Sequence, residues 1–175
     1  MNWGIRPNWG STSSQVLINA RTESLLEKAV FRKAALHHHV LVLADGYFEW
    51  QVNGKVKTPY YIHFDDHRTF CMAGIFQETI HSDGSKIGCF SILTRPASKE
   101  LASLHDRMPV ILSPDEEENW LGSTYTNDEI SRLILSLPAP KLCYYSVSAK
   151  INNARYDQPD VLTPYTPPPT LSLFD

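Results

Sequence analysis

Cysteine is scarce in this chain. Its 175 residues include only Cys71, Cys89 and Cys143, and no Cys-x-x-Cys pair occurs. So few cysteines without regular spacing argue against a disulfide framework and provide no zinc-binding motif. Each cysteine lies in or beside an apolar or aromatic run, so all three are expected to be small buried hydrophobic residues. The sequence therefore predicts neither a metal ion nor a cofactor.

Long apolar runs and a strong net charge are also missing. No stretch of about 18 apolar residues and no secretory signal is present, which predicts a cytoplasmic protein with no membrane partner. The formal net charge of −3 argues against indiscriminate nucleic-acid binding through bulk charge, so contact with DNA requires a local basic face. Candidates for such a face are Arg6, Arg21, Arg32, Lys33, Arg95, Arg107, Lys150 and Arg155. The length suits one substantial hydrophobic core.

The residue pattern predicts a mixed fold. Ser113-Pro114 is typical of a helix start, because serine caps the helix and proline fits its first position. Asn53-Gly54 is a strong hairpin signal. Helices are expected at 24–36, from 113 onward and at 127–137, and strands at 40–50, 59–64, 70–76, 89–94 and 144–147. Because strands and helices do not alternate regularly, the predicted class is α+β, with a mainly antiparallel, barrel-like sheet and peripheral helices.

The most informative segment is Ala44-Asp45-Gly46-Tyr47-Phe48-Glu49-Trp50. It follows an apolar strand and places one carboxylate, Glu49, among three aromatic rings after a bend that glycine permits. A carboxyl group that loses solvation tends to have a raised pKa, which suits proton transfer near neutral pH. The alternative is that Glu49 is a surface residue of an alternating strand or caps a turn.

Two further segments carry polar side chains at short spacing. Asn19, Arg21 and Glu23 occupy alternate positions, so an extended chain would point all three to one side. His105 and Arg107 follow an apolar strand and a short helix-like stretch. Each also has a structural interpretation: Asn19 as a cap, Arg21 paired with Glu23, and His105 as a buried, hydrogen-bonded histidine.

Three consecutive histidines, His37 to His39, suggest a metal site at first sight. Consecutive side chains point in different directions on a helix or a strand, so a solvated end of an element is favoured.

Taken in order and spacing, several motifs resemble the SOS-response-associated peptidase (SRAP) family. They are 3–9 (Trp-Gly-Ile-Arg-Pro-Asn-Trp), 19–23 (Asn-Ala-Arg-Thr-Glu), 44–50, 73–75, 92–94 and 105–109 (His-Asp-Arg-Met-Pro). The resemblance covers about residues 3 to 163. It implies an SRAP-like fold and a protein that recognises abasic sites in single-stranded DNA and links to them covalently, as part of the response to DNA damage.

The resemblance also implies roles for individual residues. Glu49 would protonate the ring oxygen of the deoxyribose and later reverse the link, and His105 would assist ring opening and imine formation. Asn19 would orient a nucleophilic cysteine. Arg21 and Arg107 would bind phosphates flanking the lesion in a bidentate geometry that lysine cannot match. Trp9 would stack on or wedge beside an unpaired base, or else belong to the core.

One difference from the family concerns the nucleophile. Family members begin Met-Cys-Gly-Arg, and the cysteine forms a thiazolidine with the sugar aldehyde, whereas this chain begins Met1-Asn2-Trp3-Gly4. Two interpretations remain: an abasic-site processing enzyme whose start is misassigned, or a catalytically silent module that binds single-stranded DNA or a sliding clamp. A thiol hydrolase using Cys89 with His105 is a weaker third, because a cysteine in an apolar strand is poorly placed to become a thiolate.

The composition changes after Gln158, so the SRAP-like domain is expected at 1–158 and a separate tail at 159–175. Five of the chain's 12 prolines lie between Pro159 and Pro169, which predicts a stiff, extended tether. The tail ends in Thr170-Leu171-Ser172-Leu173-Phe174-Asp175, which resembles the bacterial sliding-clamp-binding motif. Leu171, Leu173 and Phe174 would then fill a clamp pocket, although Thr170 replaces the usual glutamine; alternatively, the apolar end folds back on its own domain.

Overall fold

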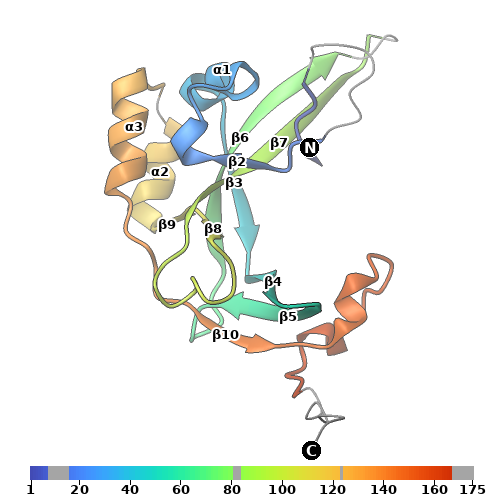
Figure 1. Ribbon diagram of the computed structural model, residues 1–175. Coiled ribbons are helices and arrows are strands. Elements are labelled where there is room, and N and C mark those ends of the chain that lie inside the picture. The colour runs from blue at the N-terminus through green and yellow to red at the C-terminus, as the bar shows by residue number, and fades with distance from the viewer. Residues whose placement is uncertain (8–15, 81–83, 123, 167–175) are drawn as a thin grey trace, which may run out of the picture.

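The computed structural model describes residues 1–7, 16–80, 84–122 and 124–166 (Figure 1). Four candidate residues, Trp9, Leu171, Leu173 and Phe174, lie outside these ranges. Within the described residues, no helix is long and apolar enough to cross a membrane.

A seven-stranded sheet forms the upper part of the molecule in Figure 1. Its centre is the antiparallel pair β6 (Phe70–Ile80) and β7 (Lys86–Pro96), and β3 (His39–Ala44) pairs antiparallel with β6. Two short strands, β1 (Asn2–Trp3) and β2 (Asn19–Arg21), pair in parallel with β7. The sheet is therefore mixed, although antiparallel pairs predominate.

The strands β6 and β7 separate at one end, and the chain returns to fill the gap. β8 (Arg107–Pro109) pairs with the end of β7, and β9 (Ile111–Leu112) pairs with the start of β6. Between them, the Ala73 N–H donates to the Val110 carbonyl and the Val110 N–H donates to the Leu93 carbonyl. This insertion places the turn that precedes Arg107 at the edge of the sheet.

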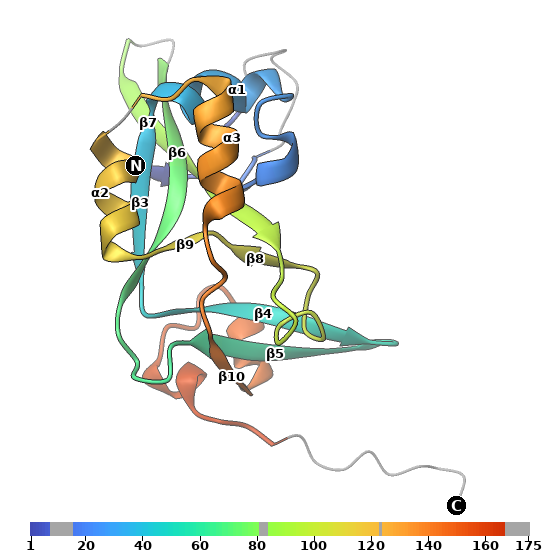
Figure 2. The same ribbon diagram turned by 90° about the vertical axis from the view of Figure 1, so that its left-hand side faces the viewer.

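A second sheet of three antiparallel strands lies below the first, in the order β10 (Cys143–Ser146), β5 (Val56–His63) and β4 (Gly46–Asn53) (Figure 2). The chain passes from β3 to β4 through a bend at Asp45. A Cβ atom on Gly46 would lie 2.3 Å from the Tyr61 ring, so this close approach requires glycine. The β4–β5 turn contains Gly54 at φ +60°, which confirms the hairpin predicted from Asn53-Gly54.

Helices cover the face of the large sheet that lies on the left in Figure 1. They are α1 (Ala29–His37), α2 (Pro114–Gly122) and α3 (Asn127–Ser136), and a short 3-10 turn, η1 (Thr22–Ser24), precedes them. A capping box between Thr126 and Glu129 begins α3. Trp120 is fully buried in the core beneath the helices, where its indole N–H donates to the carbonyls of Val40 and Gly74.

The α+β class is confirmed, but the described residues form two open sheets and no closed barrel. The strand expected at 40–50 is divided at Asp45. The helix expected at 24–36 begins only at Ala29, because Lys28 has an extended backbone (φ −80°, ψ 113°) at its N-cap. The helices from 113 onward and at 127–137, and the strands around 59–64, 70–76, 89–94 and 144–147, are present.

The three histidines occupy different environments where α1 ends and β3 begins. His37 is exposed and His38 stacks on Phe76, whereas His39 is buried against Trp120 with its Nε2 2.8 Å from the Ala35 carbonyl. The expectation of a solvated element end therefore fails for His39. Among the described residues, no group of three or more metal-binding side chains comes together.

The described part of the tail differs from an extended tether. After η2 (Ala149–Asn152), residues Pro159–Leu162 form a 3-10 turn, η3. The Tyr145 hydroxyl donates to the Leu162 carbonyl at 2.8 Å, and the Tyr165 N–H donates to the Ser146 carbonyl at 2.9 Å. These hydrogen bonds attach the chain as far as Tyr165 to β10. The proline content indicates a stiff segment, but it does not show that the segment binds a neighbouring strand.

Candidate active site

A cavity of about 710 Å³ lies where the edge of the seven-stranded sheet faces β4. All five described candidate residues line it: Asn19, Arg21, Glu49, His105 and Arg107. They come from β2, from β4 and from the turn that enters β8. The structure therefore brings together side chains that are far apart in the sequence.

Glu49 and His105 form the polar centre of the cavity. Glu49 lies on β4, where one carboxylate oxygen, Oε1, accepts a hydrogen bond of 3.1 Å from the Trp50 N–H. The other oxygen, Oε2, lies 3.8 Å from Nδ1 of His105. The Glu49 side chain is 25% exposed and the His105 side chain 42% exposed, so both reach solvent through the cavity. A proton can pass between them with a small movement of either side chain.

The backbone restricts the tautomer of His105. The Arg107 N–H donates to Nδ1 at 3.1 Å, so in the neutral imidazole Nδ1 is the acceptor and Nε2 carries the hydrogen. Asp106 Oδ1 lies 3.2 Å from the same nitrogen. When the ring is protonated, Nδ1 faces the carboxylates of both Glu49 and Asp106. The neutral ring can accept a proton at Nδ1 once the Arg107 N–H turns away from that lone pair, and Nε2 is its hydrogen-bond donor.

A hydrogen bond between β4 and the loop that carries His105 helps to hold Glu49 and His105 at this separation. The Gln51 side chain, two residues from Glu49 on β4, donates to the Ser103 carbonyl at 2.9 Å in the loop that carries His105. The Tyr60 hydroxyl lies 3.4 Å from the Gln51 carbonyl oxygen. Because alternate residues share one face of a strand, Glu49 and Gln51 approach this loop together.

The two arginines differ. Arg21 is exposed, and its side chain has no ion pair or hydrogen bond with any described residue. Arg107 has a side chain only 14% exposed, paired with Glu23 through both terminal nitrogens. The Arg107 hydrogen bond lowers the pKa of Glu23 to about 2. The expected alternative for Arg21, a pair with Glu23, is therefore not formed, since Arg107 is the partner.

The end of β2 explains why Glu23 pairs with Arg107 and not with Arg21. β2 exposes Asn19 and Arg21 and buries Ala20, as predicted from alternation, but the strand ends at Arg21. The chain then turns through η1, which directs Glu23 toward Arg107. Alternation alone did not indicate this turn.

Sequence reasoning missed several residues that line the cavity, among them Trp3, Lys28, Tyr47 and Met108. Tyr47 has a buried hydroxyl group with no hydrogen-bond partner among the described residues. Burial, and secondarily the charge of Glu49, raise the pKa of Tyr47. Its place two residues before Glu49 is the signal that identifies it, because both side chains share a face of β4.

None of the three cysteines, all of which the structure describes, lines this cavity. Cys89 is 6% exposed in the core beneath the helices, which removes it from His105 and argues against the thiol hydrolase interpretation. Cys71 is also buried, and burial raises its pKa. Cys143 is only half-buried, with its thiol 3.7 Å from an Asp65 carboxylate oxygen, so the expectation that all three are buried is wrong for Cys143.

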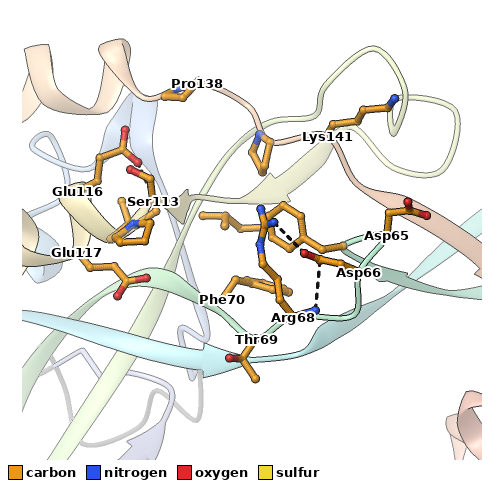
Figure 3. Close-up of a pocket in the computed structure, with 15 residues that line it drawn as sticks. Asp65, Asp66, Arg68, Thr69, Phe70, Ser113, Glu116, Glu117, Pro138 and Lys141 are labelled. Carbon is orange, nitrogen blue, oxygen red and sulfur yellow. Dashed lines mark hydrogen bonds and ion pairs between the residues drawn. The ribbon is translucent and has the colours of Figure 1, made fainter.

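A second cavity, of about 790 Å³, lies between the β5–β6 loop, the start of α2 and residues 138–141 (Figure 3). Arg68 crosses it, stacked on Phe64 and paired with Asp66 at 3.1 Å. The candidate residues that the structure describes all lie elsewhere. The described candidate residues therefore gather in the smaller of these two cavities.

The smaller of these two cavities brings a carboxylate and an imidazole together with two arginine side chains, between the two sheets of an α+β fold. The family model of the SOS response associated peptidase (SRAP) matches residues 1–154, and the chain belongs to this family.

The relatives of this chain cover most of its length. It is 30% identical over 166 residues to abasic site processing protein YoqW of Bacillus subtilis (strain 168), covering 93% of this chain and 74% of the relative. It is 30% identical over 164 residues to abasic site processing protein YedK of Escherichia coli (strain K12), covering 93% and 72%. A crystal structure of a protein from Bacteroides thetaiotaomicron superimposes with a TM-score of 0.82 at 29% identity, covering 94% of this chain and 75% of that one.

Proposed function

We propose that this protein processes abasic sites in single-stranded DNA. The observation that carries the proposal is the Glu49–His105 pair in a cavity that Arg21 also lines, in a chain whose relatives are named abasic site processing proteins. An abasic sugar offers a hemiacetal to an acid and flanking phosphates to cations. The cavity has a group for each.

The first chemical step is opening of the sugar ring. Glu49, in its protonated form, donates its proton to the ring oxygen while the C1′–O bond breaks and the C1′ hydroxyl loses its proton to His105. The product is the open-chain aldehyde, and one proton has entered and one has left. The 3.8 Å between Glu49 Oε2 and His105 Nδ1 allows the proton to return to the carboxylate for the reverse reaction.

The next step is the covalent link. In the family pattern, the amine of an N-terminal cysteine condenses with the aldehyde and releases water, and its thiol adds to the resulting imine to close a thiazolidine. We propose that Asn19, on the cavity wall, orients this nucleophile through its amide. The printed sequence begins Met1-Asn2, so the covalent step is tested with and without an added cysteine.

Phosphates provide the remaining contacts. We propose that Arg21 binds a phosphate with its full fork, since no described side chain occupies it, and that Arg107 contributes a further N–H. Trp9 is proposed to stack on a base beside the lesion. Arg21→Ala should weaken binding to abasic and intact strands alike, because phosphate contacts carry no base information.

The experiment mixes the purified 175-residue chain with single-stranded DNA that carries one abasic site and resolves the products on a denaturing gel. A version extended at its N-terminus with the family segment beginning Cys-Gly-Arg runs beside it. We expect an adduct with the extended chain, slowed by Glu49→Gln. Absence of both an adduct and a preference for abasic strands in the extended chain would sink the proposal.

A second function is favoured by one observation: no thiol lines the cavity. The 175 residues alone would then act as a module that binds abasic single strands without linking to them. Preferential binding without a denaturant-resistant adduct supports this alternative, and an adduct formed by the 175-residue chain contradicts it.

We also propose that Leu171, Leu173 and Phe174 dock on a bacterial sliding clamp, on the strength of their sequence pattern. Replacing Leu173 and Phe174 by alanine should abolish clamp binding and leave DNA binding intact. Equal clamp binding by the wild type and the alanine variant would rule out docking through these residues.

A further inference from the structure

Glu23 and Arg107 are 84 positions apart in the sequence and form an ion pair. Arg107 lines the cavity, and Glu23 holds it from outside the cavity lining. Arg107 donates from Nη1 to Glu23 Oε1 and, at 2.9 Å, from Nη2 to Glu23 Oε2. Nη2 also donates to the Thr94 carbonyl, with the Thr94 hydroxyl 3.3 Å away. The arginine is therefore held from two sides, by a carboxylate from η1 and by the backbone of β7.

Few donors of Arg107 remain. A guanidinium group has five N–H donors in a fixed plane. Glu23 accepts two and Thr94 accepts one, and Nε is buried without a partner among the described residues. One N–H on Nη1 is left. The edge that arginine ordinarily presents to a phosphate in a bidentate geometry is thus occupied by Glu23, and the expected bidentate role of Arg107 becomes a single directed contact.

Charge distinguishes Arg107 from Arg21 as well. The hydrogen bond from Arg107 lowers the pKa of Glu23 to about 2, so the carboxylate is ionised at neutral pH and cancels the arginine charge. Arg21 has no described partner and keeps its charge. Arg21 can therefore attract any phosphate, whereas Arg107 provides orientation with little net attraction.

We propose that Glu23 is a positioning residue. Its carboxylate fixes the guanidinium plane of Arg107, so that one N–H meets a phosphate oxygen of a strand whose abasic sugar occupies the cavity. The same carboxylate cancels the charge of Arg107, so that intact strands gain little from it. This inference rests on the proposed function, since the ligand is the abasic strand.

The test compares wild type, Glu23→Gln and Glu23→Asp in binding to two single strands that differ only in one tetrahydrofuran abasic analogue, over a range of salt concentrations. Glu23→Gln exposes the charge of Arg107, so binding to the intact strand should tighten at low salt and log K should fall more steeply with log salt, by about 0.7. Preference for the abasic strand should fall by about tenfold, because one directed, charge-assisted hydrogen bond is lost. Glu23→Asp keeps the charge and should retain the wild-type salt dependence.

Glu78→Gln is the matched control, because Glu78 is a carboxylate of a surface ion pair with Lys86, outside the cavity. It changes the net charge equally and should alter neither the preference nor the salt dependence. If Glu23→Gln behaves like this control, the proposal is wrong. The proposal is also wrong if Glu23→Gln loses affinity for both strands in proportion to its loss of folded protein, since that result describes a purely structural ion pair.

A measurement without DNA separates this proposal from the proposed function. Nuclear magnetic resonance reports hydrogen exchange at Nε of Arg107, which is buried in the wild type. Exchange should accelerate in Glu23→Gln as the guanidinium group becomes mobile, and unchanged exchange would refute the positioning role. A wild type that shows slow exchange and no preference for abasic strands would instead refute the proposed function alone.

Discussion

The two faces of the seven-stranded sheet differ in whether their buried polar atoms have hydrogen-bond partners. Beneath the helices, Trp120 is fully buried and its N–H is shared between two main-chain carbonyls. On the cavity side, the Tyr47 hydroxyl and Nε of Arg107 are buried without partners, and no other described side chain has such an atom. An unpaired buried polar atom costs free energy, so the helix side is built for stability. The cavity side leaves hydrogen-bonding capacity unused at the place where we propose that a substrate binds.

The largest effect is expected from a substitution in the core beneath the helices. Trp120→Ala should lower the free energy of unfolding by about 3–5 kcal/mol, because it leaves a large cavity in the core. Chemical denaturation measures this loss, and Trp120→Phe offers a milder variant that keeps the protein folded. The exposed Trp3 is the matched control, since Trp3→Ala should cost well under half as much. Equal losses of unfolding free energy in Trp120→Ala and Trp3→Ala would contradict the conclusion that the helix side is built for stability.

Gly46→Ala should have the next largest effect, at a residue that lines the cavity. The added Cβ would meet the Tyr61 ring at 2.3 Å, so we expect a loss of about 1–3 kcal/mol from overpacking. Gly122→Ala is the control, because open space surrounds that position. The double variant Gly46→Ala with Tyr61→Leu should recover part of the loss. A Gly46→Ala protein as stable as wild type would show that the ring moves freely.

The Glu23–Arg107 pair should make part of the stability depend on acid pH. The pKa of Glu23 is about 2 in the folded protein and 4.5 without the interaction. Because the folded value is the lower one, the pair stabilises the fold fully above about pH 4.5, and this stabilisation is lost as the pH falls toward 2. Denaturation of wild type and Glu23→Gln across this window should show a shrinking difference. Arg107→Gln should remove the same dependence, and a constant difference would contradict the pairing.

Tyr47→Phe should have the smallest effect. It removes a buried hydroxyl group that has no partner among the described residues, so stability should be unchanged or rise by up to about 1 kcal/mol. Tyr60→Phe provides the comparison, because that hydroxyl lies 3.4 Å from Gln51 and its removal should cost stability. Thermal unfolding distinguishes the two. A clear loss in Tyr47→Phe would mean that the hydroxyl is satisfied in solution.

Local signals predicted much of the fold. Asn53-Gly54 produced the β4–β5 hairpin, because glycine tolerates the positive φ of its turn, and Ser113-Pro114 marked the start of α2. Spacing within each motif also identified the candidate residues that line the cavity. These features depend on a few neighbouring residues and so can be read from the sequence.

Other features depend on distant contacts. The partner of Glu23 is 84 positions away, and nothing in 19–23 indicates that the strand ends at Arg21. The parallel pairing of β1 and β2 with β7 carries no turn signal. The attachment of Tyr165 to β10 could not be predicted, because proline content describes stiffness and not the hydrogen bonds available on a neighbouring strand.

The bend at Asp45 gives the cavity a mechanical property. Glu49 is carried on a straight arm, the first residues of β4, that projects about 13 Å beyond the bend at roughly 3.3 Å per residue. A rotation of about 5° at the bend would therefore displace the carboxylate by about 1 Å, a large fraction of the tolerance of proton transfer. The Gln51–Ser103 hydrogen bond lies beyond Glu49 on this arm and restrains its rotation about the bend. Small changes in the angle between the two sheets would therefore change the distance between the Glu49 carboxylate and the His105 imidazole, now 3.8 Å.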